Sequence, residues 1–256
     1  MNSSILPLLC DPDSHERLEF KSEALINPKS GKHYPVRDGI PIFLDQVFGQ
    51  NKKYQELYER IAIFYDVADR IYRWLKRKDY YRYGYLEELE VAPGARVLEV
   101  SIGTGANIPL IRSDVEFFGL DLTWAMLRRC SQNLRKWKRS AELFQGEAER
   151  LPFIDSAFDV VFHVGGINFF NDKARAIREM IRVAKPGTKI IIADETEKTV
   201  KESYAKTPIV KEYFEKGTGQ VAAPLDLIPS NMLEVRSKDL AHGRLYCITF
   251  RTPRNA

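Results

Sequence analysis

Cysteine is scarce in this sequence, with only Cys10, Cys130 and Cys247 among 256 residues. Three dispersed thiols are too few for a disulfide framework, so the composition excludes a disulfide-stabilised secreted domain and favours a reducing, cytoplasmic compartment. No stretch approaches the roughly 18 consecutive apolar residues that a membrane-spanning helix needs. The N-terminal segment also lacks the basic region of a signal peptide. We therefore expect no membrane span.

An excess of charge of one sign is also missing. The 39 Lys and Arg residues against 35 Asp and Glu leave a net charge of +4, which by itself points neither to nucleic acid nor to an acidic metabolite. Hydrophobic residues at 44% and charged residues at 29% exclude collagen-like, coiled-coil and wholly disordered chains. The length suits one large domain, or one of ordinary size with a small appendage.

The pattern of apolar residues changes twice along the chain. Residues 1–48 hold short apolar runs between turn formers such as Asp38-Gly39, which predicts a small β-rich subdomain. Residues 49–92 show apolar residues at helical spacing and predict a helical lead-in or lid. Residues 93–256 alternate short apolar runs with helical stretches, which predicts a doubly wound parallel sheet closed by an antiparallel C-terminal hairpin.

A glycine-rich loop follows the first predicted strand of this sheet. Gly103 and Gly105 allow a sharp turn and a close approach of the backbone to a ligand. A pair of glycines alone is equally typical of a structural turn. Asp121, however, ends the next predicted strand, where a carboxylate accepts ribose hydroxyls in such sheets.

Two kinds of ligand use this layout. A dinucleotide-binding loop needs a third small residue for helix packing, and that position holds Ile108. The loop also starts with Glu99, which is unfavourable beside a pyrophosphate. S-adenosylmethionine carries a ribose, an ammonium and a sulfonium but no phosphate, so the acidic loop favours it over NAD.

Five segments in order resemble those of the class I S-adenosylmethionine-dependent methyltransferases, in the style of the ubiquinone/menaquinone-biosynthesis-like enzymes (methyltransferase domain type 11). They are Val97–Gly105, Gly119–Thr123, Gly146–Phe153, Phe158–Val161 and Ala184–Thr188. The resemblance covers about residues 54–195, including the lead-in Tyr58–Asp66. It implies a Rossmann-like seven-stranded sheet, mostly parallel, and a methyltransferase activity (EC 2.1.1.-).

The resemblance also implies roles for residues along the cofactor. Glu99 would hold the methionine ammonium, and Asp121 both ribose hydroxyls. Leu122 would lie against the adenine, and the Glu147 side chain or the Ala148 amide would meet the adenine amine. The alternatives are a solvated carboxylate at the strand end for Glu99 and a surface loop for residues 147–148.

Further positions of the site lie in the glycine loop and the lead-in. Gly103 and Gly105 would approach the cofactor, whereas Ser101 stands where the family usually has its first glycine. The Ser101 side chain would weaken cofactor binding or hydrogen-bond to the methionine part. Tyr65 would cap the methionine end, although an aromatic residue at helical spacing is more often part of a core.

The implied reaction is an in-line displacement at the sulfonium methyl, in which the protein mainly orients the reactants near 3 Å. His163 is a candidate base or hydrogen-bond donor, and a buried, hydrogen-bonded core histidine is an equal alternative. Residues 165–170 lack the Asn/Asp-Pro-Pro-aromatic signature of amino-group methylation. We therefore expect an oxygen, carbon or sulfur nucleophile on a small-molecule acceptor.

The N-terminal part resembles the small Trm112-type zinc domain, notably in Tyr34–Pro41. Only Cys10 remains of its thiols, because other residues replace them: Asp13, Asn27 and Ser30. Tetrahedral zinc needs four N or S ligands, so we expect no metal. Trm112-type domains assist methyltransferases as separate partners, and a version within the same chain is the corresponding hypothesis here.

Two other functions are compatible with the sequence. The basic stretches Arg70–Arg82, with its tyrosines, and Arg128–Arg139 are of the kind that binds single-stranded RNA; an RNA or protein methyltransferase is the first alternative, although the small net charge makes nucleic acid the less favoured partner. A non-catalytic cofactor-binding or scaffold protein is the second, because of Ser101 and the lack of an obvious base.

Overall fold

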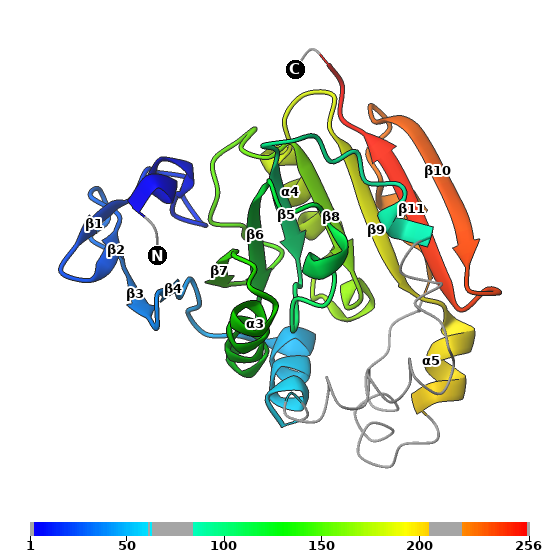
Figure 1. The fold of residues 1–256 in the computed structure, drawn as a ribbon, viewed down its shortest axis with the longest axis horizontal. Coiled ribbons are helices and arrows are strands. Elements are labelled where there is room, and N and C mark those ends of the chain that lie inside the picture. The colour runs from blue at the N-terminus through cyan, green and yellow to red at the C-terminus, as the bar shows by residue number, and fades with distance from the viewer. Residues whose placement is uncertain (1–2, 61, 63–83, 205–221, 255–256) are drawn as a thin grey trace.

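The structure is a computed structural model, and it describes residues 3–60, 62, 84–204 and 222–254. Its largest element is a seven-stranded sheet with the strand order β10-β11-β9-β8-β5-β6-β7 (Figure 1). Five strands are parallel, and β10 and β11 form an antiparallel hairpin that pairs with β9. The strands are β5 (Arg96–Val100), β6 (Glu116–Asp121), β7 (Glu142–Gln145), β8 (Val160–Val164), β9 (Lys189–Glu195), β10 (Leu233–Leu240) and β11 (Leu245–Arg251). This confirms the predicted Rossmann-like, doubly wound sheet with its C-terminal hairpin.

Helices cover both faces of this sheet because their apolar residues recur every three or four positions. α3 (Trp124–Trp137) buries Leu127, Cys130 and Leu134 in a core on one face. α4 (Lys173–Val183) buries Ile177 and Met180 in a core on the other face. Other helices among the described residues include α5 (Glu197–Tyr204) and the 3₁₀ turns η1 (Ser3–Leu8), η2 (Ile108–Leu110), η3 (Ile167–Phe169) and η4 (Leu225–Leu227).

The strand order reverses between β5 and β8. The chain runs outward from β5 through β6 to β7, and then returns to β8 on the other side of β5. In a sheet of this type the loops that leave these two strands diverge at their carboxyl ends, and a ligand lies in the crevice between them. The fold thus places the glycine loop after β5 at the usual ligand position.

A second, four-stranded antiparallel sheet lies beside the β7 edge of the first (Figure 1). Its last hairpin turns at Asp38 and Gly39, whose φ angles of 51° and 79° are those of the tight turn that Asp-Gly favours. This confirms the predicted β-rich N-terminal subdomain. Its strands are β1 (Glu19–Lys21), β2 (Ala24–Ile26), β3 (His33–Arg37) and β4 (Ile40–Pro41).

The N-terminal sheet shares a core with the larger one. Phe43 is buried, its N–H donates to the carbonyl of Gln145 at 2.8 Å, and Ile42 forms a parallel bridge to the same residue at the end of β7. Leu9 forms an antiparallel bridge to Phe153, and both are fully buried in one apolar cluster with β5 and β6 residues. Residues 1–48 and part of residues 93–256 thus share one core. The division of the chain into residues 1–48, 49–92 and 93–256 stays a prediction.

Among the described residues, no helix is both long enough and apolar enough to cross a bilayer.

Candidate functional site

The loop after β5 is built from residues in the left-handed region of φ. Ser101, Gly103 and Gly105 have φ angles of 62°, 56° and 77°, so the chain leaves the strand in a tight series of turns. The Ile102 N–H donates to the carbonyl of Leu120 at 3.0 Å and ties the loop to β6. The left-handed conformation favours glycine and is costly for serine.

Gly103 and Gly105 have different surroundings. A methyl group added to Gly105 would lie 2.7 Å from the Cys130 sulfur of α3, so this glycine permits close packing of the loop on the helix. A methyl group added to Gly103 would meet no described atom within 4 Å. The space over Gly103 is therefore where a ligand can approach the backbone.

Asp121 ends β6 beside this open space and is only 8% exposed. Its Oδ2 accepts the Gly103 N–H at 2.8 Å, and its Oδ1 accepts the Thr123 N–H at 2.9 Å. Burial raises the pKa of this carboxyl above its ordinary value. The Thr123 side chain also hydrogen-bonds to this carboxylate. Because an ionised carboxylate has about four acceptor positions, Asp121 can shape the loop and still accept from a ligand hydroxyl.

Glu99 points into a buried hydrogen-bond chain instead of into solvent. It is 2% exposed, and its Oε1 accepts from the Asn107 side-chain amide at 2.6 Å. The Asn107 Oδ1 in turn accepts from the Tyr85 hydroxyl at 2.9 Å. The geometry therefore disfavours the solvated-carboxylate alternative, and it adds Asn107 and Tyr85 as supporting residues that the sequence did not indicate.

The β7 side of the crevice is held through the backbone of Leu122. Its carbonyl accepts from the Gln145 side chain at 3.0 Å and from the Gln55 side chain at 3.1 Å. Gln55 lies in the helical segment 49–60, so the lead-in reaches this edge of the site. The Leu122 side chain is half-buried, as an adenine-contacting residue would be.

The Glu147 side chain turns toward the N-terminal part. Its Oε2 accepts from Arg150 at 2.6 and 3.0 Å, and its Oε1 accepts from the Asn51 amide at 3.1 Å. Ala148, the next residue, is buried at 5% exposure. Of the two groups predicted to meet the adenine amine, the Glu147 side chain is engaged elsewhere, so the geometry favours the backbone of Ala148, whose carbonyl can accept from the amine and whose N–H can donate to a ring nitrogen.

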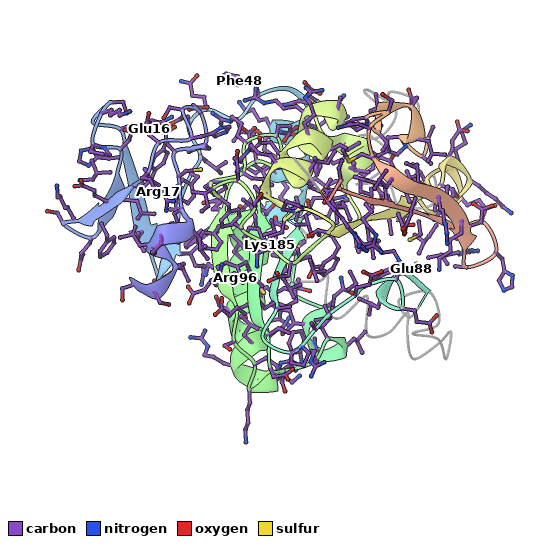
Figure 2. All side chains as sticks on the ribbon, turned by 90° about the horizontal axis from the view of Figure 1, so that it is seen from above. Glu16, Arg17, Phe48, Glu88, Arg96 and Lys185 are labelled. Atoms are coloured by element: carbon purple, nitrogen blue, oxygen red, sulfur yellow. The ribbon has the colours of Figure 1, made fainter. Side chains whose placement is uncertain are left out.

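A cavity of about 590 Å³ lies on the other side of this segment. Glu147, Arg150 and Asn51 line it together with Asp13 and Phe48 of the N-terminal part. Arg150 also donates to Asp13 at 3.0 Å. Figure 2 shows Phe48 at the surface, where it is 63% exposed. The segment that carries Ala148 is thus bounded by the N-terminal part.

His163 is fully buried at the end of β8. Its Nδ1 lies 2.9 Å from the carbonyl of Val100, and its Nε2 accepts the Ile167 N–H at 3.0 Å. Nδ1 must therefore carry the proton and donate it to that carbonyl. Burial lowers the pKa of His163 to about 4. Both nitrogens are used by the backbone, so the geometry favours the structural alternative over a catalytic base.

Asp194, at the end of β9, is a buried acid that the sequence did not indicate. It is 3% exposed, and its Oδ2 accepts the N–H groups of Gly166 and Asn168, both at 3.1 Å. Burial, and secondly the charge of Glu195, raise the pKa of Asp194 to about 7. In the sequence, Asp194 and Glu195 look like solvated acids at the end of a strand. The hydrogen bonds of Asp194 to the loop after β8 therefore could not be predicted from it.

Two sequence predictions fall partly or wholly outside the described residues. Tyr65 and the basic stretch Arg70–Arg82 lie there. The second basic stretch, Arg128–Arg139, is largely α3, and Arg139 at its end donates to the carbonyls of Ile111 and Arg112 at 2.8 and 3.0 Å. That arginine supports the fold of the loop before β6.

Hydrogen bonds organise the positions where a zinc domain would have thiols. The Asn27 amide donates to Asp11 at 2.8 Å, the Tyr34 hydroxyl donates to the same carboxylate at 2.9 Å, and Asn27 Oδ1 accepts the Ser30 N–H at 3.2 Å. Burial raises the pKa of Cys10 to about 12, which keeps it a thiol. Within the described ranges, no group of three His, Cys, Asp or Glu side chains is arranged to hold a metal ion.

Residues 98–192 match a family described as "Methyltransferase domain". The demethylmenaquinone methyltransferase of Bacillus mycoides is 28% identical over 156 residues, which cover 59% of this chain and 65% of that protein. The ubiquinone/menaquinone biosynthesis C-methyltransferase UbiE of Geotalea daltonii is 29% identical over 159 residues, covering 57% and 64%. The chain thus matches less than two thirds of the length of these relatives.

A solved structure is similar in fold. It is a chain from the complex between the Haloferax volcanii Trm112 methyltransferase activator and a proposed methyltransferase, with a TM-score of 0.62 and 15% identity over 77% of this chain and 97% of that chain. At this identity the likeness concerns the fold alone.

Proposed function

Since this chain carries a class I S-adenosylmethionine-dependent methyltransferase domain, we propose that it transfers a methyl group to a small-molecule acceptor of the hydroxylated-ring or quinol type. The observation that carries the proposal is the arrangement at the strand-order reversal: an open approach to Gly103 beside the buried carboxylate of Asp121. The matched relatives, named for quinone methylation, support this acceptor class. The three cysteines are buried outside any disulfide, which fits a cytoplasmic setting, and we propose that setting as well.

The residues at the crevice fit S-adenosylmethionine, the cofactor of this domain class. A side chain on Gly103 would fill the space over the loop. The Asp121 carboxylate suits a ribose hydroxyl, and the backbone carbonyl of Ala148 can accept from the adenine amine. Glu99, fixed by Asn107, supplies the negative charge that a methionine ammonium needs. An acidic loop of this kind would repel a pyrophosphate.

The bound cofactor supplies an electrophilic methyl group on a sulfonium. The chain's own contribution is to hold the acceptor in line with that methyl group and to exclude water. Because both His163 nitrogens are engaged by backbone groups, the site favours an acceptor that is nucleophilic without a strong base, such as the electron-rich ring carbon or the phenolate of a quinol. An oxygen, carbon or sulfur nucleophile remains within the proposal.

The acceptor proposal is tested with radiolabelled S-adenosylmethionine and a panel of acceptors. We expect label in a 1,4-naphthoquinol and none in bulk RNA or in denatured protein. An Asp121→Asn variant should lose the transfer, whereas Asp114→Asn, an exposed acid paired with Arg112, should keep it. Label in RNA that disappears at high salt would instead favour the RNA methyltransferase. Failure to label any acceptor would favour the scaffold alternative.

We further propose that the N-terminal sheet supports the adenine side of the site within the same chain, as the Trm112-type resemblance suggests. Phe43 bonds to Gln145, and the Cys10 N–H donates to the carbonyl of Pro152 at 3.0 Å. The intervening residues, which include Ala148, are thus held at both ends.

A matched pair of variants in the full chain tests this support. Phe43→Ala removes a side chain at the contact with β7, and Leu25→Ala removes one from β2, which does not pair with the larger sheet. Both should destabilise the fold by about 3 kcal/mol. Only Phe43→Ala should also weaken S-adenosylhomocysteine binding, by about tenfold. Equal affinities of the two variants would contradict the proposed support.

A further inference from the structure

The loop after β8 has four consecutive backbone N–H groups held by buried acceptors. The Gly165 N–H donates to the carbonyl of Ala193 at 2.9 Å, and the Ile167 N–H to His163. The Gly166 and Asn168 N–H groups both donate to one oxygen of Asp194. Two buried titratable side chains therefore determine the shape of residues 165–168.

This loop lies directly against the cofactor loop. Gly165 and Gly166 have φ angles of 77° and 115°, conformations that side chains disfavour. A methyl group added to Gly166 would lie 3.9 Å from both the Ser101 Oγ and His163 Cε1. The loop of residues 165–168 therefore lies beside Ser101 of the glycine loop, at the position implied for the methionine end of the cofactor.

We propose that Asp194 is a positioning residue for methyl transfer, which holds the loop 165–168 against Ser101 so that the acceptor meets the methyl group in line. This inference rests on the proposed methyltransferase function. Asp194 acts through the loop, because its oxygens are engaged by backbone N–H groups: Oδ2 by Gly166 and Asn168, and Oδ1 by Glu195 at 2.7 Å.

Several charged or titratable groups face Asp194 from neighbouring elements. Glu195 follows it on β9, and Lys173 begins α4. Asp226 of η4 acts electrostatically on the same Lys173. Tyr246 of β11 lies opposite Asp194 in the strand register. Burial, and secondly the charge of Asp194, raise the pKa of Tyr246. His163 of β8 accepts the Ile167 N–H of the same loop. Burial and Glu195 raise the pKa of Asp194, whereas the three N–H donors favour its carboxylate.

The ionisation of Asp194 gives the positioning role a specific signature. The carboxylate accepts the loop amides more strongly than the protonated acid does. As the pH falls through about 7, the bonds to Gly166 and Asn168 weaken and the loop loosens. Acceptor turnover should therefore have an acid limb near pH 7 that depends on Asp194, while cofactor binding at Asp121 should not.

The test compares Asp194→Asn with Asp226→Asn, which removes the same charge from an exposed acid that also acts on Lys173, while the loop amides stay bonded to Asp194. For Asp194→Asn we expect S-adenosylhomocysteine affinity within twofold of wild type, a kcat for the naphthoquinol at least tenfold lower, and loss of the acid limb. Asp226→Asn should keep kcat and the limb. Wild-type kcat and limb in Asp194→Asn would overturn the proposal.

A second variant tests the role of the loop without changing Asp194, in case Asp194→Asn does not fold. Gly166→Ala leaves Asp194 in place and meets no described atom closer than 3.9 Å, but it puts a side chain on φ 115°. It should reproduce the loss of kcat with cofactor binding retained; unchanged kcat would count against the loop's role.

Amide hydrogen exchange separates this proposal from the proposed function. Faster exchange at residues 166 and 168 in Asp194→Asn but not in Asp226→Asn supports the positioning contact, and unchanged exchange overturns it. A wild-type protein that methylates no acceptor overturns the proposed function, and with it the positioning for transfer, whatever the exchange rates show.

Discussion

The two glycines of the β5 loop allow the ligand-binding role of the loop to be separated from its packing role. Gly103 and Gly105 both have positive φ angles, 56° and 77°. Only Gly105 is enclosed, because an added methyl group would lie 2.7 Å from the Cys130 sulfur and 3.2 Å from the Ile108 side chain. The same substitution to alanine should therefore have two different consequences.

The magnitudes follow from these surroundings. A left-handed alanine costs about 1–2 kcal/mol, offset by about 0.5 kcal/mol because alanine restricts the unfolded chain. Gly103→Ala should thus lower the free energy of unfolding by about 1 kcal/mol. Gly105→Ala adds overpacking against α3, worth about 1–3 kcal/mol, for a total of about 3 kcal/mol.

Urea denaturation and calorimetry with S-adenosylhomocysteine measure the two effects. Gly103→Ala should bind at least tenfold more weakly, about 1.4 kcal/mol, because its methyl group enters the open space over the loop. Gly105→Ala should lose mainly stability. If Gly103→Ala bound the cofactor product as tightly as wild type, the space over Gly103 would not be the cofactor site.

Three further predictions concern the surroundings of the site. Ser101→Gly should be more stable to urea than Ser101→Ala by about 1 kcal/mol, because φ is 62° there; equal stabilities would refute the strain. Burial lowers the pKa of His163 to about 4, so this buried neutral imidazole should reduce the stability of wild type relative to His163→Gln by about 3 kcal/mol as the pH falls from 6.5 to 4; denaturant titrations of both proteins that differ by a constant amount over this range would refute it. Arg182→Met should lower the free energy of unfolding by about 3 kcal/mol, since it removes the cation 2.7 Å from the half-buried Glu179 and the donor to the Phe153 and Leu151 carbonyls; a thermal melt close to wild type would argue against this.

The sheet and its ligand-binding edge could be predicted from the sequence because the signals are local. Short apolar runs alternate with helical spacing, and Gly103, Gly105 and Asp121 fall at strand ends. Periodicity fixes which residues form strands, and the strand ends of a parallel sheet meet at one edge.

The contacts that hold the site join residues far apart in the chain, which sequence spacing does not reveal. Tyr85 is linked to Glu99 through Asn107, and Asp194 reaches Gly166 because β9 lies beside β8. The same reason hid the shared core: Phe43 bonds to Gln145 at the edge of the large sheet, which no local pattern indicates.

The central claim is that the crevice beside Asp121 binds S-adenosylmethionine, and calorimetry on the full chain tests it most directly. Wild type and Asp114→Asn should bind with the same affinity. Asp121→Asn should bind about thirtyfold more weakly, as expected for loss of charge-assisted hydrogen bonds worth about 2 kcal/mol. Failure of wild type to bind at millimolar S-adenosylmethionine, or binding by Asp121→Asn as tight as that of wild type, would contradict the account.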